Sequence, residues 1–161
     1  MNAGPGIYQK RVIDDVLDEL QPQLSAIAIE GPKAVGKTRT ALERATTVRR
    51  LDDPAELELA RSDPARLLEG AAPVLIDEWQ RLPEVWDLVR RAVDDGAPPG
   101  SFLLTGSAVP ATLPMHSGAG RIATVRMRPM SLVERGFEAS VSVAKLLGDE
   151  RPSIRGTTEF D

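Results

Sequence analysis

An apolar run from Leu24 to Glu30 is followed directly by the segment Gly31-Pro32-Lys33-Ala34-Val35-Gly36-Lys37-Thr38. This segment matches the pattern G-x-x-x-x-G-K-[ST] in full. A loop of this kind wraps a triphosphate with backbone N–H groups, because glycine lets the main chain approach without a Cβ in the way. The sequence therefore predicts a strand, a phosphate-binding loop and a helix in succession.

Each part of this loop has an expected role. Gly36 marks the turn from loop to helix, and the N-terminal amides of that helix add to the anion site. Lys37 is expected to reach the β and γ phosphates, and the Thr38 hydroxyl is expected to bind Mg²⁺. The expected nucleotide-binding residues of this segment are Gly31, Pro32, Lys33, Ala34, Val35, Gly36, Lys37, Thr38 and Arg39.

A later apolar run ends in two adjacent carboxylates, Asp77 and Glu78. At the carboxyl end of a parallel strand, Asp77 can hold Mg²⁺ beside the loop while Glu78 deprotonates an attacking water. This is the Walker B pattern; the alternative is a strand that simply enters a turn. A glutamate next to the magnesium aspartate favours hydrolysis over phosphotransfer. The chain lacks an N-K-x-D segment that would read guanine, so ATP is favoured over GTP.

The hydrophobic pattern of the whole chain indicates the fold class. Five short apolar runs alternate with stretches in which apolar residues recur every three or four positions, which is typical of α/β proteins. We expect a three-layer α/β/α P-loop NTPase domain with a mainly parallel five-stranded sheet. The runs are Leu24 to Glu30, Val48 to Leu51, Pro73 to Asp77, Ser101 to Thr105 and Ile122 to Val125; helices are expected over Arg11 to Leu20, after Gly36, in two pieces within 54–69, and over Glu84 to Val93.

Three further residues are candidates for the same site. Thr105 ends the fourth run and Ser107 follows it, at a point where a hydroxyl can sense the γ phosphate. The alternative is a strand-ending turn, and the sequence does not separate the two hydroxyls. Arg121 follows a glycine-rich segment and can stabilise charge on a transferring phosphate, in its own chain or a neighbour's; the alternative is a surface ion pair. Arg126 and Arg128 share one face of an extended segment and are interpreted as solvent-exposed; the alternative is that they bind phosphate, nucleic acid or acidic partners. His116, in a loop rich in proline and glycine, is interpreted as exposed.

Composition limits the classes of partner. The 161 residues carry 20 basic and 24 acidic side chains, which gives a net charge of -4. This charge argues against nonspecific electrostatic binding of nucleic acid or anionic lipid. There is no cysteine, so disulfides and thiolate-ligated metals are excluded. The sequence contains no apolar run of about 18 residues and no signal-peptide pattern. We expect a cytoplasmic protein that does not insert into membranes.

The ordered series of motifs resembles the AAA-like P-loop ATP-binding proteins whose longer members carry a DUF4143 region. The resemblance implies the strand order 5-1-4-3-2, an ATP-binding domain, and positions for Arg11 near the nucleotide and for Gln80 and Arg121 at the site or its rim. It covers most of residues 8–135. The matching segments are Tyr8 to Arg11, Gly31 to Thr38, Leu75 to Pro83, Phe102 to Ser107, Gly120-Arg121 and Arg128 to Glu134.

Taken together, these patterns predict a P-loop ATPase domain over residues 1–148 and a polar tail over 149–161 that begins a further region. The leading hypothesis is Mg²⁺-dependent ATP binding with slow hydrolysis, used as a switch or motor for an output region. One alternative is an ATP-binding module without productive hydrolysis; another is a small-molecule kinase, for which no lid is evident. Self-association is a possible partner interaction, and nucleic-acid binding is left open.

Overall fold

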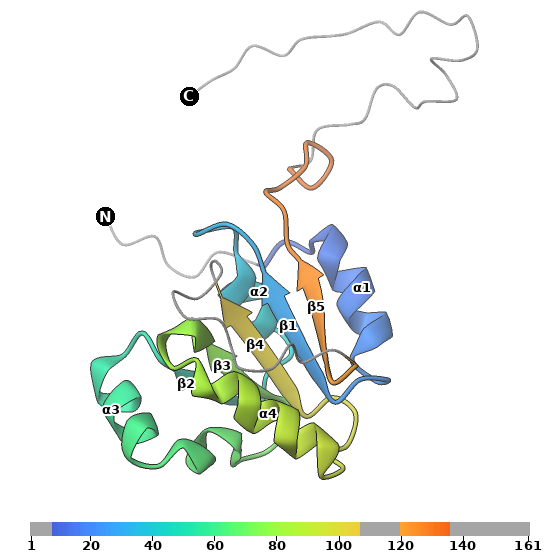
Figure 1. Cartoon of the computed structure of the whole chain (residues 1–161). Helices are drawn as coiled ribbons and strands as arrows, with labels where there is room; N and C mark the ends of the chain where they lie inside the picture. Colours follow the sequence, from blue (N-terminus) through green and yellow to red (C-terminus); the bar gives the residue numbers. More distant parts are fainter. Residues whose placement is uncertain (1–7, 107–119, 136–161) are drawn as a thin grey trace, which may run out of the picture. The chain divides into compact units, whose positions relative to one another are not determined.

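The computed structural model describes residues 8–106 and 120–135 (Figure 1). Five strands form one parallel sheet in the order β2-β3-β4-β1-β5, which confirms the expected α/β class and strand order. The strands are β1 Ala26–Glu30, β2 Thr47–Arg50, β3 Val74–Asp77, β4 Phe102–Gly106 and β5 Ile122–Arg126. The helices are α1 Val12–Leu20, α2 Lys37–Leu42, α3 Pro54–Ser62 and α4 Glu84–Asp94, with the short 3-10 helices η1 Pro64–Leu68 and η2 Trp79–Arg81.

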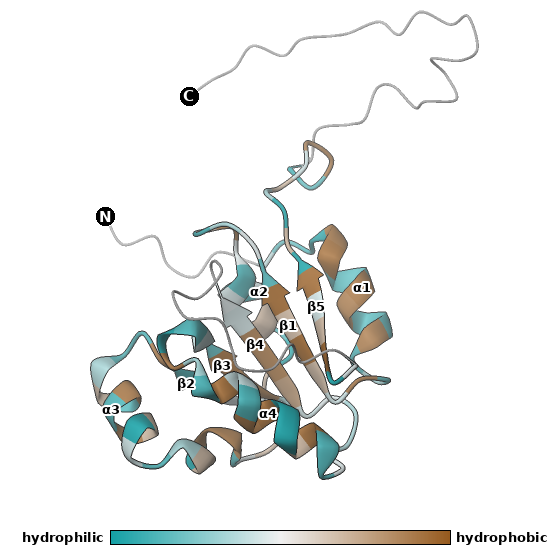
Figure 2. Ribbon diagram, viewed as in Figure 1, coloured by the Kyte–Doolittle hydropathy of each residue, from teal (hydrophilic) through white to brown (hydrophobic). Residues whose placement is uncertain are grey.

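Alternate residues of each strand point to opposite faces of the sheet, and helices cover both faces. On one face, Ala26 and Ala28 belong to a cluster with residues of α3, η1, η2 and α4, including Val89. On the other face, Ile27 and Ile29 belong to a cluster with residues of α1 and α2. Each fully buried aliphatic side chain contributes about 1.5–3 kcal/mol. The central strands β1, β3 and β4 are correspondingly apolar, whereas β2, with Arg49 and Arg50, and the outer surface of α4 are hydrophilic (Figure 2).

The predicted break between residues 54 and 69 has a clear local cause. Asp53 caps α3 by accepting a hydrogen bond of 2.8 Å from the amide of Ala55, and Pro54 occupies the first helical turn. The helix ends at Ser62 and Pro64 starts a new helix. The second piece, η1, is a 3-10 helix. Within residues 8–106 and 120–135, no helix has the length and apolar character needed to span a membrane.

The chain divides into two compact units, residues 1–129 and 130–161. The sheet and its helices belong to the first unit. In the described part of the second unit, the amide of Ser131 donates to Glu134 Oε2 at 2.7 Å and the amide of Glu134 donates to Ser131 Oγ at 3.3 Å. This reciprocal pair fixes a turn. The tail predicted from residue 149 lies outside the described residues.

Candidate functional site

All five strands run in the same direction, so their carboxyl ends meet at one edge of the sheet. The loop 31–36 leaves β1 at this edge, Asp77 ends β3, and Thr105 lies near the end of β4. The register pairs Thr105 with Ile29 on one side and with Asp77 on the other. In open α/β sheets ligands bind at this edge, so three distant motifs of the sequence converge where a ligand is expected.

The loop has the backbone geometry of a close-fitting cradle. Gly36 caps α2 with φ of 105°, and Ala34 also has a positive φ of 63°. A Cβ on Gly31 would lie 2.4 Å from the backbone oxygen of Met127, so this position has no space for a side chain. The glycines at both ends of the loop are therefore required by its shape.

Lys37 is buried, with 5% of its surface exposed, and its ammonium lies within the loop. Nζ donates to the carbonyl oxygens of Gly31 at 2.9 Å and Pro32 at 2.8 Å. Burial lowers the pKa of Lys37, and the negative charges of Glu78 and Asp77 partly oppose that change. The loop thus holds a cation against its own carbonyl groups, which phosphate oxygens can replace as acceptors.

Asp77 is 4% exposed and accepts hydrogen bonds from two hydroxyls. Thr38 Oγ1 donates to Asp77 Oδ1 at 2.8 Å, and Thr105 Oγ1 donates to the same oxygen. One carboxylate and one hydroxyl are hard oxygen ligands, which suits Mg²⁺ completed by substrate phosphates and water. The described residues contain no group of three or more His, Asp or Glu that could form an all-protein metal site, and a Mg²⁺ site of this kind requires none.

Glu78 has an unusual backbone conformation. Its φ of 57° and ψ of 42° lie in the left-handed region, which costs a non-glycine residue about 1–2 kcal/mol. Its carboxylate accepts a hydrogen bond from Gln80 Nε2. Trp79 and Gln80 pack closely over Gly106, where a Cβ would lie 2.8 Å from each of their polar atoms. A carboxylate with a strained backbone therefore lies next to Asp77, as occurs at functional sites.

A family model described as AAA domain (AAA_14) matches residues 23–135, a range that includes the loop and both carboxylates. The chain belongs to this AAA domain family. It is 29% identical over 120 residues to two mycobacterial proteins, Uncharacterized protein Rv2008c of Mycobacterium tuberculosis and Uncharacterized protein Mb2031c of Mycobacterium bovis. The alignment covers 71% of this chain and 27% of each relative, so the chain spans about a quarter of their length. The expected AAA-like family is confirmed, whereas the DUF4143 type stays a prediction.

The other residues predicted from sequence occupy different surroundings in this AAA domain. Thr105 is 1% exposed and contacts Asp77, whereas Ser107 lies outside the described residues. Arg39 forms an ion pair of 3.0 Å with Glu43. Lys33 is exposed on the loop.

Arg121 is not brought to the loop within one chain. It precedes β5, whereas the loop follows the parallel neighbour β1, so the two lie at opposite edges of the sheet, separated by roughly 16 Å of strand. Arg121 Nε instead donates to Asp94 at 2.7 Å, which lowers the pKa of Asp94. The expected action on the chain's own nucleotide therefore has no support in the geometry, and an action on a neighbouring molecule stays a prediction.

Arg11 is 7% exposed and contacts the backbone of the AAA domain in two places. Its Nη1 donates to the carbonyl of Val35 at 3.0 Å and its Nη2 to the carbonyl of Arg128 at 2.9 Å. Arg11 thus contacts the phosphate loop through a main-chain carbonyl, and its expected position near the nucleotide stays a prediction. Sequence reasoning missed Met127, a buried residue that packs under the loop. The one signal was an apolar residue directly after the fifth run, between two arginines.

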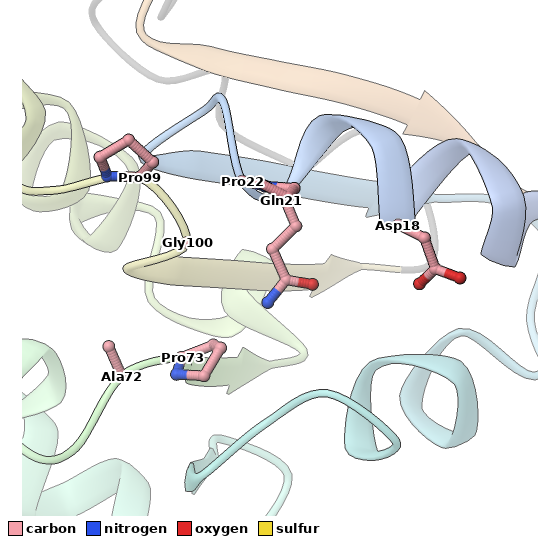
Figure 3. A pocket seen from close by; sticks show the side chains of 7 residues that line it. All are labelled: Asp18, Gln21, Pro22, Ala72, Pro73, Pro99 and Gly100. Atoms are coloured by element: carbon pink, nitrogen blue, oxygen red, sulfur yellow. The ribbon is translucent and has the colours of Figure 1, made fainter.

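A pocket of about 470 Å³ lies at the other edge of the sheet (Figure 3). Its lining comes from the end of α1 and from the turns before β3 and β4, including Asp18, Gln21 and Pro99. One carboxylate, one amide and several prolines provide no cation for an anionic ligand. This pocket is separate from the loop and from Asp77.

Proposed function

We propose that this AAA domain binds ATP together with Mg²⁺ at the loop 31–36 and at Lys37 and Thr38, which follow it, and that it hydrolyses ATP slowly. The observation that carries the proposal is the shared carboxylate oxygen of Asp77, which accepts hydrogen bonds from Thr38 beside the loop and from Thr105 on the neighbouring strand. Two hydroxyls and a carboxylate therefore lie beside the phosphate loop at one edge of the sheet. That set of groups is what Mg²⁺-nucleotide binding requires.

In this proposal each residue of the site has a separate role. The loop amides and Lys37 bind phosphate oxygens, and Thr38 and Asp77 hold the metal. Mg²⁺, when bound, neutralises charge on the β and γ phosphates. Glu78 orients and deprotonates the attacking water, and Thr105 responds to the γ phosphate through its contact with Asp77. Lys37 already contacts two loop carbonyls, so phosphate has to displace an existing pair of hydrogen bonds.

For the whole protein, we propose that the nucleotide state is used as a switch or motor for a further region, as the resemblance to DUF4143-type proteins implies. The two mycobacterial relatives are much longer than the aligned segment, in agreement with such an arrangement. A cytoplasmic location and self-association are parts of the same proposal. Turnover that rises steeply with protein concentration, and falls in Arg121→Ala, would support assembly with a neighbour's arginine.

The test combines binding and turnover. Calorimetry with Mg-ATP measures affinity, and phosphate release measures hydrolysis, in the wild type, in Glu78→Gln and in the matched control Glu84→Gln. We expect all three to bind ATP and only Glu78→Gln to lose turnover, by about 100-fold or more. Glu84 is the control because it is exposed at the start of α4 and undergoes the same chemical change. A folded wild type that binds no Mg-ATP contradicts the proposal.

A second candidate function is nucleotide binding without productive hydrolysis. It is favoured by the hydrogen bond that Gln80 donates to Glu78 Oε2, because this bond occupies one of the two carboxylate oxygens that could accept a proton from water. Tight ATP binding with no turnover at any protein concentration would select this candidate. Turnover that depends on Glu78 would reject it.

A further inference from the structure

The chain segment that follows β5 is packed against both ends of the phosphate loop. The amide of Met127 donates to the carbonyl of Glu30 at 2.7 Å, just before the loop begins. The backbone oxygen of Met127 fills the space where a Cβ of Gly31 would lie. The methyl group of Met127 is 3.5 Å from the corresponding position on Gly36, and the residue is 1% exposed. We call residues 127–128, where the chain leaves β5, the exit of β5. Met127 of this exit therefore packs directly against the phosphate loop.

Arg11 joins the same two segments from the side of α1. Its guanidinium donates one hydrogen bond to Val35 of the loop, at 3.0 Å, and one to Arg128 of the exit, at 2.9 Å. A guanidinium is planar and its donors keep a fixed spacing, so the two carbonyls are held at a fixed separation. A shift of either carbonyl has to move the other one or break a charge-assisted hydrogen bond.

Arg11 itself is held in place by a buried network. Asp14 Oδ2 accepts hydrogen bonds of 2.6 Å from the Arg11 amide and from the Tyr8 hydroxyl, and Asp14 Oδ1 accepts one of 2.6 Å from Arg44. The Tyr8 hydroxyl also lies 2.9 Å from Thr40 Oγ1, on the helix that begins at the loop. These hydrogen bonds connect α1 to α2, and they hold the start of α1, and with it the Arg11 guanidinium, in place.

We propose that Arg11 is a positioning residue that transmits occupancy of the phosphate loop to the exit of β5 at Met127 and Arg128. This inference rests on the proposed function. Lys37 now holds the carbonyls of Gly31 and Pro32, and phosphate binding exchanges these bonds for bonds to phosphate. The loop that contains Val35 then changes its interactions, and Arg11 passes the change to Arg128. The first compact unit ends one residue later, at Pro129, so the signal arrives where the chain enters the second unit.

The test measures amide hydrogen exchange residue by residue, by NMR, with and without Mg-ATP. The loop reporters are the amides of Val35 and Gly36, and the exit reporters are those of Met127 and Arg128. Arg11→Lys keeps the charge but removes the planar fork. Arg128→Ala is the matched control, because it removes an exposed arginine side chain and leaves the carbonyl that Arg11 contacts.

In the wild type and in Arg128→Ala, we expect Mg-ATP to slow exchange about fivefold or more at both the loop and the exit. In Arg11→Lys, we expect the loop to respond and the exit response to fall below about twofold. A uniform structural loss would change exchange without nucleotide, but it would not remove the nucleotide-dependent difference at the exit alone. Arg11→Gln is the second variant if Arg11→Lys does not fold.

Two results would overturn the coupling while leaving nucleotide binding intact: an exit response in Arg11→Lys equal to that of the wild type, or a wild-type exit that does not respond although the loop does. A wild-type loop that does not respond to Mg-ATP, together with no heat of binding, refutes the proposed function and the coupling with it. The loop amides therefore distinguish the two failures.

Discussion

Thr38 and Asp77 are 39 positions apart in the sequence, and a hydrogen bond of 2.8 Å joins their side chains. The bond connects the first turn of α2 to the end of β3. The carboxylate oxygen that accepts it also accepts the Thr105 hydroxyl from β4. One oxygen of Asp77 thus ties together the phosphate loop, the third strand and the fourth strand, so changes at this residue are informative about the site.

Asp77→Asn is expected to abolish the contribution of Mg²⁺ to ATP affinity, lowering affinity for Mg-ATP about tenfold or more, because the amide lacks the charge that a hard cation requires. The fold should persist, since the amide oxygen can still accept from Thr38 and Thr105. Calorimetry with ATP in Mg²⁺ and in EDTA measures the difference. The control Asp95→Asn, at an exposed position after α4, should retain the full effect of Mg²⁺. Equal metal dependence in Asp77→Asn and the wild type would reject the assignment.

Glu78→Gly is expected to be more stable than Glu78→Gln by roughly 1 kcal/mol, because glycine adopts a φ of 57° without the steric cost paid by other residues. Both variants lack the carboxylate, so the difference in their stability reflects the backbone strain together with the contacts that the glutamine side chain keeps. Urea unfolding measures the free energies. If the glycine variant is less stable than the glutamine variant, contacts of the side chain at position 78 stabilise the fold by more than the backbone strain costs.

Gly31→Ala is expected to destabilise the fold by about 2–3 kcal/mol and to weaken ATP binding, because the new Cβ would lie 2.4 Å from a backbone oxygen of Met127. Backbone at this point cannot move without displacing the loop or the exit of β5. Gly96→Ala is the control: its φ is 94° but nothing lies within 4 Å of the added methyl, so only the strain of about 1 kcal/mol applies. Thermal and urea unfolding of both variants would reveal the difference, and equal losses would contradict the close contact.

Asp14 is expected to make stability depend on acid pH. Burial raises the pKa of Asp14, but hydrogen bonds from Tyr8, the Arg11 amide and Arg44 outweigh burial and leave the pKa below the ordinary 3.8. The unfolded chain therefore takes up this proton at a higher pH than the folded chain does. The stabilisation is complete above the unfolded value near 3.8 and is lost as the pH falls through the lower folded value.

Asp14→Asn should consequently cost about 3 kcal/mol at neutral pH, since it breaks a buried pair with Arg44, and the cost should shrink as the medium is acidified below the ordinary pKa of a carboxyl. Urea unfolding across this pH range measures the effect. Asp15→Asn is the matched control because that neighbouring carboxylate is largely exposed in its ion pair with Lys10. A stability difference for Asp14→Asn that stays constant down to acid pH would rule out the titration of Asp14 as its cause.

Much of the fold and part of the candidate site could be predicted because their signals are local. Continuous apolar runs identify strands covered on both faces, and each predicted run overlaps one strand of the sheet. The break before Pro64 follows from steric exclusion at the preceding residue. That the second piece is a 3-10 helix was not predicted, because the last turns of a short helix depend on what packs against them.

The placement of individual side chains was less predictable. Two candidate hydroxyls lie at the end of the fourth run, and the register with β3 gives Thr105 a carboxylate partner. Arg121 follows a glycine-rich segment in the sequence. Because β5 runs parallel to β1 and Arg121 precedes β5, this residue lies at the edge of the sheet opposite the loop. Met127 gave almost no signal, since its importance comes from the parallel pairing of β5 with β1.

By itself, the sequence determined that a glycine-bounded loop with Lys37 and Thr38 follows a buried strand, and that Asp77 and Glu78 end another one. These features depend on residues adjacent in the chain, whose conformational preferences act locally. Only the tertiary structure decided that Arg11 spans Val35 and Arg128, and that Arg121 pairs with Asp94. Such contacts depend on strand order and direction, which follow from how the whole chain buries its apolar surface.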